Sequence, residues 1–364
     1  MNLWSAFCEK QLLKTDNLHF LQKIHTFISI KYKIMASKKS EFEMQEVFIK
    51  HLKQVVPANV SLVDDIADLL KISNDSAYRR LRNETELSLD ETYKICKHYK
   101  ISADSIFSNK GDSVTCNYIK LTDSAENFES YLNSLLTQLT RLQKAEDAKI
   151  IYAAEEIPIF HSFFSKELAA FKMFYWQRSV LNVPEYQSKK FDWDSIPEKQ
   201  LQIAENIHKT YLQVPSSEIW TDDTINTTIK QIEYYFESGA FKEKEDAITV
   251  LLELKKMMQA INSYAENETK SPTSTFSLYN SDLVIGTNCI HITVQGSVYS
   301  YISFNTLNSL TTGNQQFCEE IEHWTKNLTK KSTLISGIAE KQRFQFFSKA
   351  YKAIDASIER IKNY

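Results

Sequence analysis

The chain has 364 residues, of which 43% are hydrophobic and 12% aromatic, so it has enough apolar side chains for two or three folded domains. A formal net charge of −3 excludes a protein that binds polyanions over its whole surface. No apolar run approaches the roughly 20 residues needed to cross a bilayer, so we expect a cytoplasmic protein without a membrane partner.

Residues 1–34 form an N-terminal extension in which lysines are scattered among apolar residues, unlike the apolar centre of a signal peptide. Met35 is followed by Ala, Ser and two lysines, which reads like an ordinary start before a folded domain. One hypothesis is therefore that translation begins at Met35. The intact mass of the natively expressed protein tests it.

The first domain is expected over residues 35–107, and a helix opens it. The apolar stripe of this helix ends before Pro57, because proline cannot continue a helix. The stripe consists of Phe42, Val47, Phe48, Leu52 and Val55.

Residues 64–84, DDIADLLKISNDSAYRRLRNE, predict two short helices that cross. In the first, apolar side chains recur at helical spacing, Ser61 is the candidate N-cap, and the helix should end near Lys71. The apolar positions are Ile66, Leu69 and Leu70.

Ser73 opens the second helix, whose inward positions are Ala77 and Leu81. Its outward positions carry amide and guanidinium groups, which can meet base edges and phosphates. These outward residues are Asn74, Asp75, Tyr78, Arg79 and Arg82.

Two more helices complete the domain. Residues 88–91, Ser-Leu-Asp-Glu, form a capping box that opens a helix, and Ser102 opens a short last turn that ends at Ile106 and Phe107. Five helices in about 70 residues, together with ISNDSAYRRLRNETELSLDETYKICKHYKISADSIF, resemble the phage-repressor-like (XRE/Cro-type) helix-turn-helix domain over residues 41–107.

The resemblance implies a role for individual residues. Ala67 and Ile72 become packing residues, and Lys71 takes a turn position that is often Gly, so Lys71 must adopt a left-handed backbone or the turn must differ. For Arg80 the alternatives are to point across the backbone or to pair with Asp75 or Glu84. The implied DNA contacts are Ser73, Asn74, Ser76, Tyr78, Arg79 and Arg82.

The positive charge of this domain is concentrated in residues 71–82. Residues 35–107 hold 11 Lys and Arg against 12 Asp and Glu, whereas residues 71–82 hold four basic residues and one acidic residue. DNA binding would therefore rely on a positive face of one helix and would weaken readily as salt rises. The alternative is a protein-interaction module that has lost DNA binding.

Residues 108–270 are expected to be a mainly helical dimerisation and sensor region. A polar linker at 108–113 leads into a strand, VTCNYIKL, and then a helix over about 124–147, after which the short apolar run 150–154 could be another strand. A stripe along this helix has the spacing of a coiled-coil seam, so it could be a dimer contact or could pack on its own domain. The stripe consists of Phe128, Leu132, Leu135, Leu139 and Leu142.

An aromatic segment after Pro158 offers two interpretations: the wall of an apolar ligand pocket, or plain core. His161 and Arg178 are the nearest polar groups, and a lone His at such a place is more often a hydrogen-bonded core residue than a ligand. The aromatic residues are Phe160, Phe163, Phe164, Phe171, Phe174, Tyr175 and Trp176.

Residues 271–364 are expected to form a small α+β unit. SLYNSDLVIG, NCIHITV and VYSYISF alternate with period two and predict an antiparallel meander, with a hairpin turn at Gln295-Gly296. A helix near 314–328, a strand STLIS and a final helix from about 339 follow. The predicted fold class is thus mainly α: a five-helix domain, a helical region, and a small C-terminal α+β unit with an antiparallel sheet.

The sequence carries little catalytic chemistry. With six glycines it has no phosphate-binding loop, and it has none of the common hydrolase or zinc-protease motifs. Cys289 and His291 share a strand face but lack an orienting third group, and Glu155-Glu156 are expected to be solvated. The five cysteines are Cys8, Cys96, Cys116, Cys289 and Cys318, and without a CxxC pair they indicate reduced thiols and no metal site.

These patterns predict a sequence-specific DNA-binding transcription regulator, not an enzyme and without a cofactor. Its expected partners are double-stranded DNA, a second copy of the chain in a homodimer, and a small-molecule effector. The alternative is an interaction scaffold or a cryptic enzyme whose helix-turn-helix only autoregulates its own gene.

Overall fold

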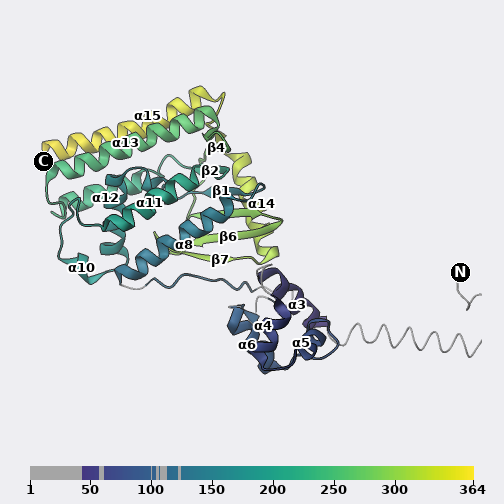
Figure 1. Ribbon diagram of the computed structural model, residues 1–364. Helices are drawn as coiled ribbons and strands as arrows, with labels where there is room; N and C mark the ends of the chain where they lie inside the picture. Colours follow the sequence, from purple (N-terminus) through teal and green to yellow (C-terminus); the bar gives the residue numbers. More distant parts are fainter. Residues whose placement is uncertain (1–42, 57–60, 100, 104–105, 107–112, 122–123) are drawn as a thin grey trace, which may run out of the picture. The chain divides into compact units, whose positions relative to one another are not determined.

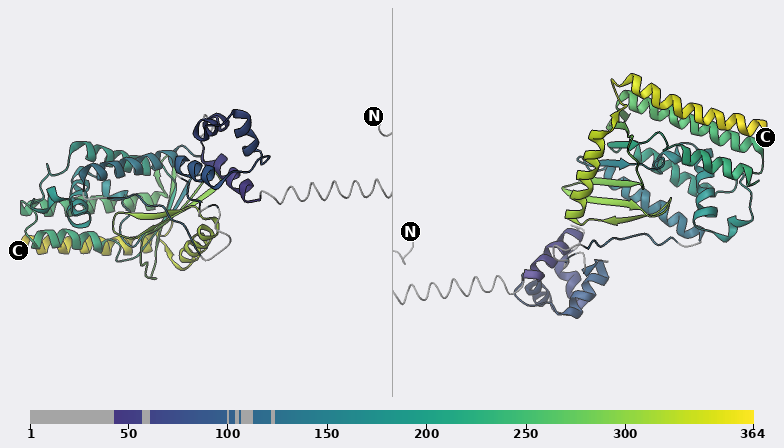
Figure 2. Two further views of the ribbon diagram at one scale, coloured as in Figure 1. Left: turned by 90° about the horizontal axis from the view of Figure 1, so that it is seen from below. Right: turned by 180° about the vertical axis from the view of Figure 1, so that it is seen from behind.

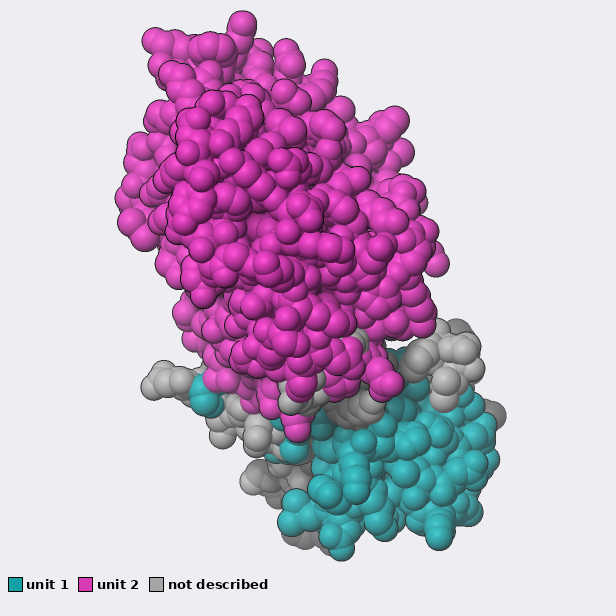
Figure 3. Space-filling view, turned by 90° about the vertical axis from the view of Figure 1, so that its left-hand side faces the viewer, with its two compact units in different colours: residues 1–113 teal, residues 114–364 magenta. Residues whose placement is uncertain are grey.

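The computed structural model describes residues 43–56, 61–99, 101–103, 106, 113–121 and 124–364 (Figure 1). The expected extension 1–34, the Met35 start, Phe42, Pro57, Phe107 and most of the polar linker lie outside these residues. The chain divides into two compact units, residues 1–113 and residues 114–364, called unit 1 and unit 2 below (Figure 3).

Unit 1 is built from short helices around one apolar core. Phe48, Leu52, Ile66, Ala77 and Ile95 are buried in it, so each helix turns one face inward. The helices are α3 (Glu43–Val55), α4 (Leu62–Leu70), α5 (Asn74–Leu81) and α6 (Leu89–Tyr99).

Two local predictions for unit 1 can be checked directly. The capping box is confirmed, because the backbone N–H of Ser88 donates to the Glu91 carboxylate (2.9 Å) and the N–H of Glu91 donates to the Ser88 hydroxyl (3.2 Å). The apolar stripe of α3 is only partly right. Val47 is 45% exposed, and Ile49 and Val56 are buried instead.

Unit 2 is built on one mixed sheet. Its strand order is β3-β4-β2-β1-β5-β6-β7, and β8 adds to β4. The pairs β1/β2 and β2/β4 are parallel, whereas β1/β5, β5/β6 and β6/β7 are antiparallel. The strands are β1 (Lys149–Ala153), β2 (Ser216–Trp220), β3 (Thr269–Ser271), β4 (Ser274–Asn280), β5 (Cys289–Val294), β6 (Ser297–Ser303), β7 (Ser309–Thr312) and β8 (Thr333–Leu334).

The predicted fold class is therefore wrong for this part of the chain. β1 forms where the apolar run 150–154 suggested a strand, whereas β2 was not expected. Both come from the region expected to be mainly helical, yet they occupy the middle of an eight-stranded mixed sheet. β4 does not join the meander; it pairs in parallel with β2, and helices make the long connections that parallel neighbours require. The expected strand at 114–121 is reduced to a single bridge between Asn117 and Thr311.

Helices cover both faces of the sheet (Figures 1 and 2). α14 covers one face, where Ala153, Ile219 and Leu328 form a small core. The other helices lie on the opposite face, over the main core. The helical elements of unit 2 are α8 (Ala125–Gln143), η1 (His161–Phe163), α9 (Lys166–Tyr175), η2 (Trp176–Val180), α10 (Pro184–Gln187), α11 (Glu198–Tyr211), α12 (Asn226–Glu237), α13 (Lys244–Asn267), α14 (Gln315–Lys331) and α15 (Glu340–Asn363).

The stripe along α8 faces the interior of its own unit. Phe128, Leu132, Leu139 and Leu142 are all buried within the main core. The second interpretation of the stripe, packing on its own domain, therefore holds, and these side chains are not free to form a dimer seam. No helix among the described residues is long and apolar enough to span a membrane.

Candidate functional site

The first candidate site is the outer face of α5, which a tight turn positions against α4. Lys71 ends α4 in a left-handed conformation (φ 57°, ψ 48°), and the N–H of Ile72 donates to the carbonyl of Ala67 (3.0 Å). Ala67 and Ala77 are buried, and their small side chains let the two helices approach closely. The turn position implied for Lys71 thus takes the left-handed form.

Three of the implied DNA contacts project from this face without taking part in packing. Tyr78 is 48% exposed, Arg79 and Arg82 are exposed, and the Arg82 guanidinium lies 5.5 Å from the centre of the Tyr78 ring. Arg82 also pairs loosely with Glu84 (3.4 Å), an exposed ion pair that contributes little. Arg79 makes no side-chain hydrogen bond or ion pair within the described residues, so its guanidinium is available to a ligand.

The other three implied contacts have roles within the fold. The Ser73 hydroxyl caps α5 by accepting from the N–H of Ser76 (3.3 Å), and it donates to the Ser76 hydroxyl (3.0 Å). The Asn74 amide donates to Asp64 on α4 (2.6 Å). Ser73 and Asn74 are exposed and Ser76 is half-buried, so a ligand that approaches this end of α5 would compete with these local bonds.

Arg80 belongs to the scaffold and not to the outer face. Its guanidinium donates to both carboxylate oxygens of Glu91 on α6 (2.9 and 3.3 Å) and to the carbonyl of Ser76 (3.2 Å). The sequence suggested Asp75 or Glu84 as partners, and neither pairs with Arg80. Burial acts to raise the pKa of Glu91, but hydrogen bonds from Ser88 and the charge of Arg80 outweigh burial and hold that pKa below its usual range.

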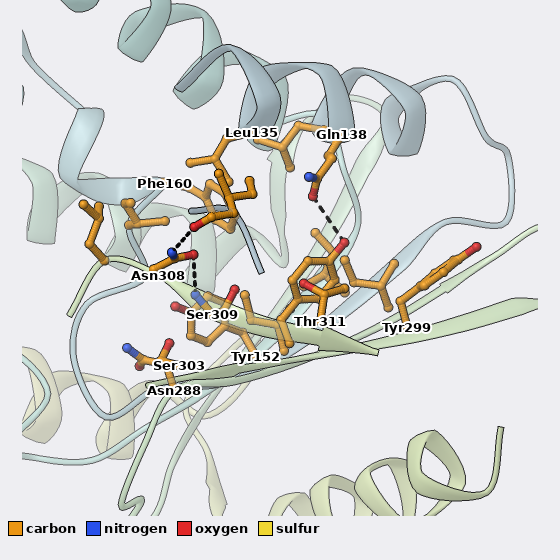
Figure 4. Close-up of a pocket in the computed structure, with 18 of the residues that line it drawn as sticks. Leu135, Gln138, Tyr152, Phe160, Asn288, Tyr299, Ser303, Asn308, Ser309 and Thr311 are labelled. Carbon is orange, nitrogen blue, oxygen red and sulfur yellow. Dashed lines mark hydrogen bonds between the residues drawn. The ribbon is translucent and has the colours of Figure 1, made fainter. Parts of the chain in front are cut away.

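The second candidate site is a pocket of about 730 Å³ in unit 2, between α8 and the sheet. Leu135 and Gln138 point from α8 toward the strands that carry Tyr152, Tyr299 and Thr311 (Figure 4). The Tyr301 hydroxyl donates to Gln138 across the pocket (3.2 Å). This volume lies within the range of about 300–1,000 Å³ that small-molecule sites occupy.

The aromatic segment divides between pocket and core. Phe160 and Trp176 line the pocket. Phe163, Phe171 and Phe174 are buried in the main core, and the half-buried Phe164 and Tyr175 pack against it. The core interpretation therefore holds for most of the segment, while Phe160 and Trp176 border a cavity whose occupant stays a prediction.

One end of the pocket carries two buried ionisable side chains of opposite charge. Glu156 is 5% exposed and Lys172 is 2% exposed, and the Lys172 ammonium donates to the side-chain amide oxygen of Gln231 (2.9 Å). Burial raises the pKa of Glu156 and lowers that of Lys172, and each charge partly offsets the effect on the other. Glu156 was expected to be solvated, but only its neighbour Glu155 is exposed.

A buried polar cluster near β2 was not predicted from the sequence. Glu218 accepts hydrogen bonds from His161 (3.0 Å), Tyr211 (2.5 Å) and Trp220 (2.9 Å). Burial acts to raise the pKa of Glu218, but the facing His161, Lys270 and Tyr211 outweigh it and lower that pKa. All of these groups are buried, so the cluster belongs to the interior and offers no access to a substrate.

Cys289 and His291 do share a strand face, which lies on the α14 side of β5. Both are buried, and burial raises the pKa of the Cys289 thiol to about 12, so the thiolate needed for nucleophilic attack is scarce. Nδ1 of the His291 ring lies 3.3 Å from the Ser300 hydroxyl. Cys96, Cys116, Cys289 and Cys318 are free cysteines, and the described residues bring together no metal-binding group of His, Cys, Asp or Glu.

Comparison of the chain with protein-family models, with curated proteins and with solved structures finds no match.

Proposed function

We propose that the chain is a sequence-specific DNA-binding transcription regulator, with α5 of unit 1 as the helix that enters the major groove. The observation that carries this proposal is the outer face of α5, where Tyr78, Arg79 and Arg82 are exposed while Ala77 and Leu81 on the inner face are buried. Arginine reads guanine edges by paired hydrogen bonds, and the major groove, about 12 Å wide, admits an α-helix.

The scaffold behind this face supports the proposal. Arg80 bonds to Glu91 and fixes α5 on α6, and the Gln45 amide donates to the carbonyls of Arg80 (3.1 Å) and Thr85 (2.9 Å). Contacts held by α3, α4 and α6 keep the backbone of α5 rigid, which favours specific recognition over loose electrostatic attraction. The Lys71 ammonium, in the turn before α5, would contact a DNA phosphate and so fix the position of α5 along the groove.

Unit 2 would then supply dimerisation and signal sensing. In a homodimer, two copies of α5 would read half-sites separated by about 34 Å, one turn of DNA, and the operator would be a palindrome. Because the α8 stripe is buried within unit 2, another surface would have to make the dimer contact. The pocket beneath α8 is the candidate site for a small-molecule effector.

The proposal is tested by selecting bound sequences from a random DNA pool with the full-length protein at physiological salt. A single recovered motif, especially a palindrome, is the expected result. Recovery of nothing above background would contradict the proposal.

Variants then place the interface. Arg79→Ala and Arg82→Ala should each weaken binding to the recovered motif by roughly 1–3 kcal/mol if the side chain contacts a base. Lys97→Ala, on the exposed surface of α6, is the matched control and should leave affinity nearly unchanged. Equal effects of all three would show that α5 is not the reading helix, and circular dichroism would confirm that each variant is folded.

A further inference from the structure

We propose that the pocket of unit 2 binds an elongated, mainly apolar acid, with its anionic group beside Arg141 and Lys144 and a hydroxyl or similar hydrogen-bonding group at its far end. This inference concerns unit 2 alone and does not depend on DNA binding by unit 1.

The pocket follows the length of α8 and β5. From Asn288 to Gln295, which both line it, the extended chain covers about 23 Å at roughly 3.3 Å per residue. From Tyr131 to Lys144, which line it from above, a helix covers about 20 Å. The two measures agree, so the pocket is long compared with its volume of about 730 Å³ and suits a chain more than a compact ring system.

Contacts at each end tie these two walls together. The Tyr131 hydroxyl donates to the carbonyl of Leu307 (2.6 Å), and the N–H of Ser303 donates to the carbonyl of Asn288 (3.0 Å). Because Ser303 and Leu307 are four residues apart, the start of α8 and the start of β5 lie at the same end of the pocket. At the other end of the pocket, the N–H of Gln295 donates to the carboxylate of Asp147, which follows α8 (2.9 Å). Figure 4 shows Asn288 and Ser303 at one end of the pocket and Tyr299 toward the other.

The middle of the pocket is mainly apolar, apart from the hydrogen-bonded pair of Gln138 and Tyr301. Side chains from α8 form one wall and alternate residues of β1 and β5 form the facing wall, as the period-two geometry of strands requires. These apolar lining residues include Leu135, Leu139, Leu142, Ile150, Ile290 and Ile292.

The end near the last turn of α8 is open and positive. Arg141 and Lys144 line the pocket there and are exposed, and neither forms an ion pair within the described residues. Asp147 lies close in sequence but does not line the pocket; it accepts from the backbone of Gln295. At the opposite end the charges of Glu156 and Lys172 cancel. The net positive charge of the lining therefore lies at the Arg141 end, where it favours an anion.

The inner end has hydrogen-bonding capacity that the protein does not use. Glu156 Oε2 and Trp176 Nε1 are buried and have no hydrogen-bond partner, although both residues line the pocket. A buried polar atom left unpaired costs about 1–3 kcal/mol. A hydroxyl can donate to a carboxylate and accept from an indole N–H, so a ligand that ends in this group would satisfy both atoms.

The test measures how well defined chains displace the fluorophore N-phenylnaphthylamine from the full-length protein, below their micellar concentrations. The probes are hexadecanoate, ω-hydroxyhexadecanoate and the methyl ester of the hydroxy acid, which has the same chain without the charge. The hydroxy acid should bind most tightly, and its ester about fivefold to tenfold more weakly. Equal affinity of the acid and the ester would overturn the anionic end, and equal affinity of the two acids would overturn the inner end.

Variants separate this site from unspecific association. The double variant Arg141→Ala/Lys144→Ala should lower affinity for the hydroxy acid about fivefold to tenfold and leave the ester unaffected. Lys149→Ala, exposed and outside the lining, is the control and should change neither. Leu135→Trp should reduce binding of all three chains by filling the pocket. Absence of binding by every chain to the folded wild-type protein would overturn the proposal.

Discussion

At the scale of single residues, a few buried charges organise the interior of unit 2. Glu218 is fully buried and is held by His161, Tyr211 and Trp220, while the Lys270 ammonium donates to Ser216 (2.8 Å) and lies 3.6 Å from the centre of the Tyr211 ring. Removing one partner from such a cluster leaves an uncompensated buried charge, which costs more than the pair contributes. The shifted pKa values of Lys270 and Glu218 therefore contribute to how stability responds to pH.

Lys270 should make the free energy of unfolding rise with pH between about 7 and 9. Burial lowers its pKa to about 7, with the charge of Glu218 opposing this shift, whereas the unfolded lysine titrates near 10.5. In this range the unfolded chain binds more protons than the folded chain, so raising the pH favours folding, by on the order of 1 kcal/mol per pH unit. His208, whose burial lowers its pKa to about 4, titrates below this range.

The measurement is urea unfolding of the wild type and of Lys270→Met at several pH values. The difference in free energy between the two should grow in favour of the wild type as pH rises from 7 to 9. Lys149→Met, at an exposed lysine, is the control and should leave the pH dependence as in the wild type. Parallel pH profiles of the wild type and Lys270→Met would contradict the assignment.

At the scale of secondary-structure elements, local sequence signals predicted helix ends better than they predicted strands. The capping box at Ser88 and Glu91 forms as the spacing predicts. β2 was missed because Glu218 interrupts its apolar pattern. A carboxylate can be buried there because His161, Tyr211 and Trp220 donate hydrogen bonds to it. The stripe of α8 has the spacing of a seam, but spacing alone does not say which surface it meets.

The helix caps of unit 1 should differ in what they contribute to stability. Ser88→Ala removes the hydroxyl that accepts from the N–H of Glu91, so it should lower the free energy of unfolding by about 1 kcal/mol. Ser61 occupies the N-cap of α4 without a capping side-chain hydrogen bond, so Ser61→Ala should change it by less than about 0.5 kcal/mol. Hydrogen exchange of the amides in unit 1 measures both. Equal losses would contradict this account of the caps.

At the scale of the whole molecule, unit 2 is one cooperative structure across the boundary expected near residue 270. β1 pairs with β5, and β2 pairs with β4, so each central strand depends on a partner that comes later in the chain. α13 and α15 also lie side by side, and the Lys244 ammonium donates to the carbonyl of Lys362 (2.7 Å; Figure 1). The pairings β1/β5 and β2/β4 both cross residue 270, so neither half of unit 2 contains all the partners of the central strands.

Truncation tests this dependence. Residues 114–364 produced alone should unfold in a single cooperative transition, because they contain the complete sheet and its core. Residues 114–270 should show no cooperative transition, because β1 and β2 would lose the strands on both outer sides and expose unpaired backbone. Urea unfolding followed by near-ultraviolet circular dichroism measures both. A cooperative transition in 114–270 would instead favour the smaller domains expected from the sequence.

The sequence by itself determined what depends on neighbouring residues. It predicted the helices of unit 1, the inward positions of α5, the capping box and the candidate face of Tyr78, Arg79 and Arg82, because helical periodicity and caps act within a few residues. Only the tertiary structure decided that Arg80 pairs with Glu91, that β1 and β2 lie in the centre of a mixed sheet, and that Glu156 lines a pocket. Those features join residues far apart in the chain. The free energy that stabilises them comes from strand pairing and burial between distant segments, which the pattern of neighbouring residues does not predict.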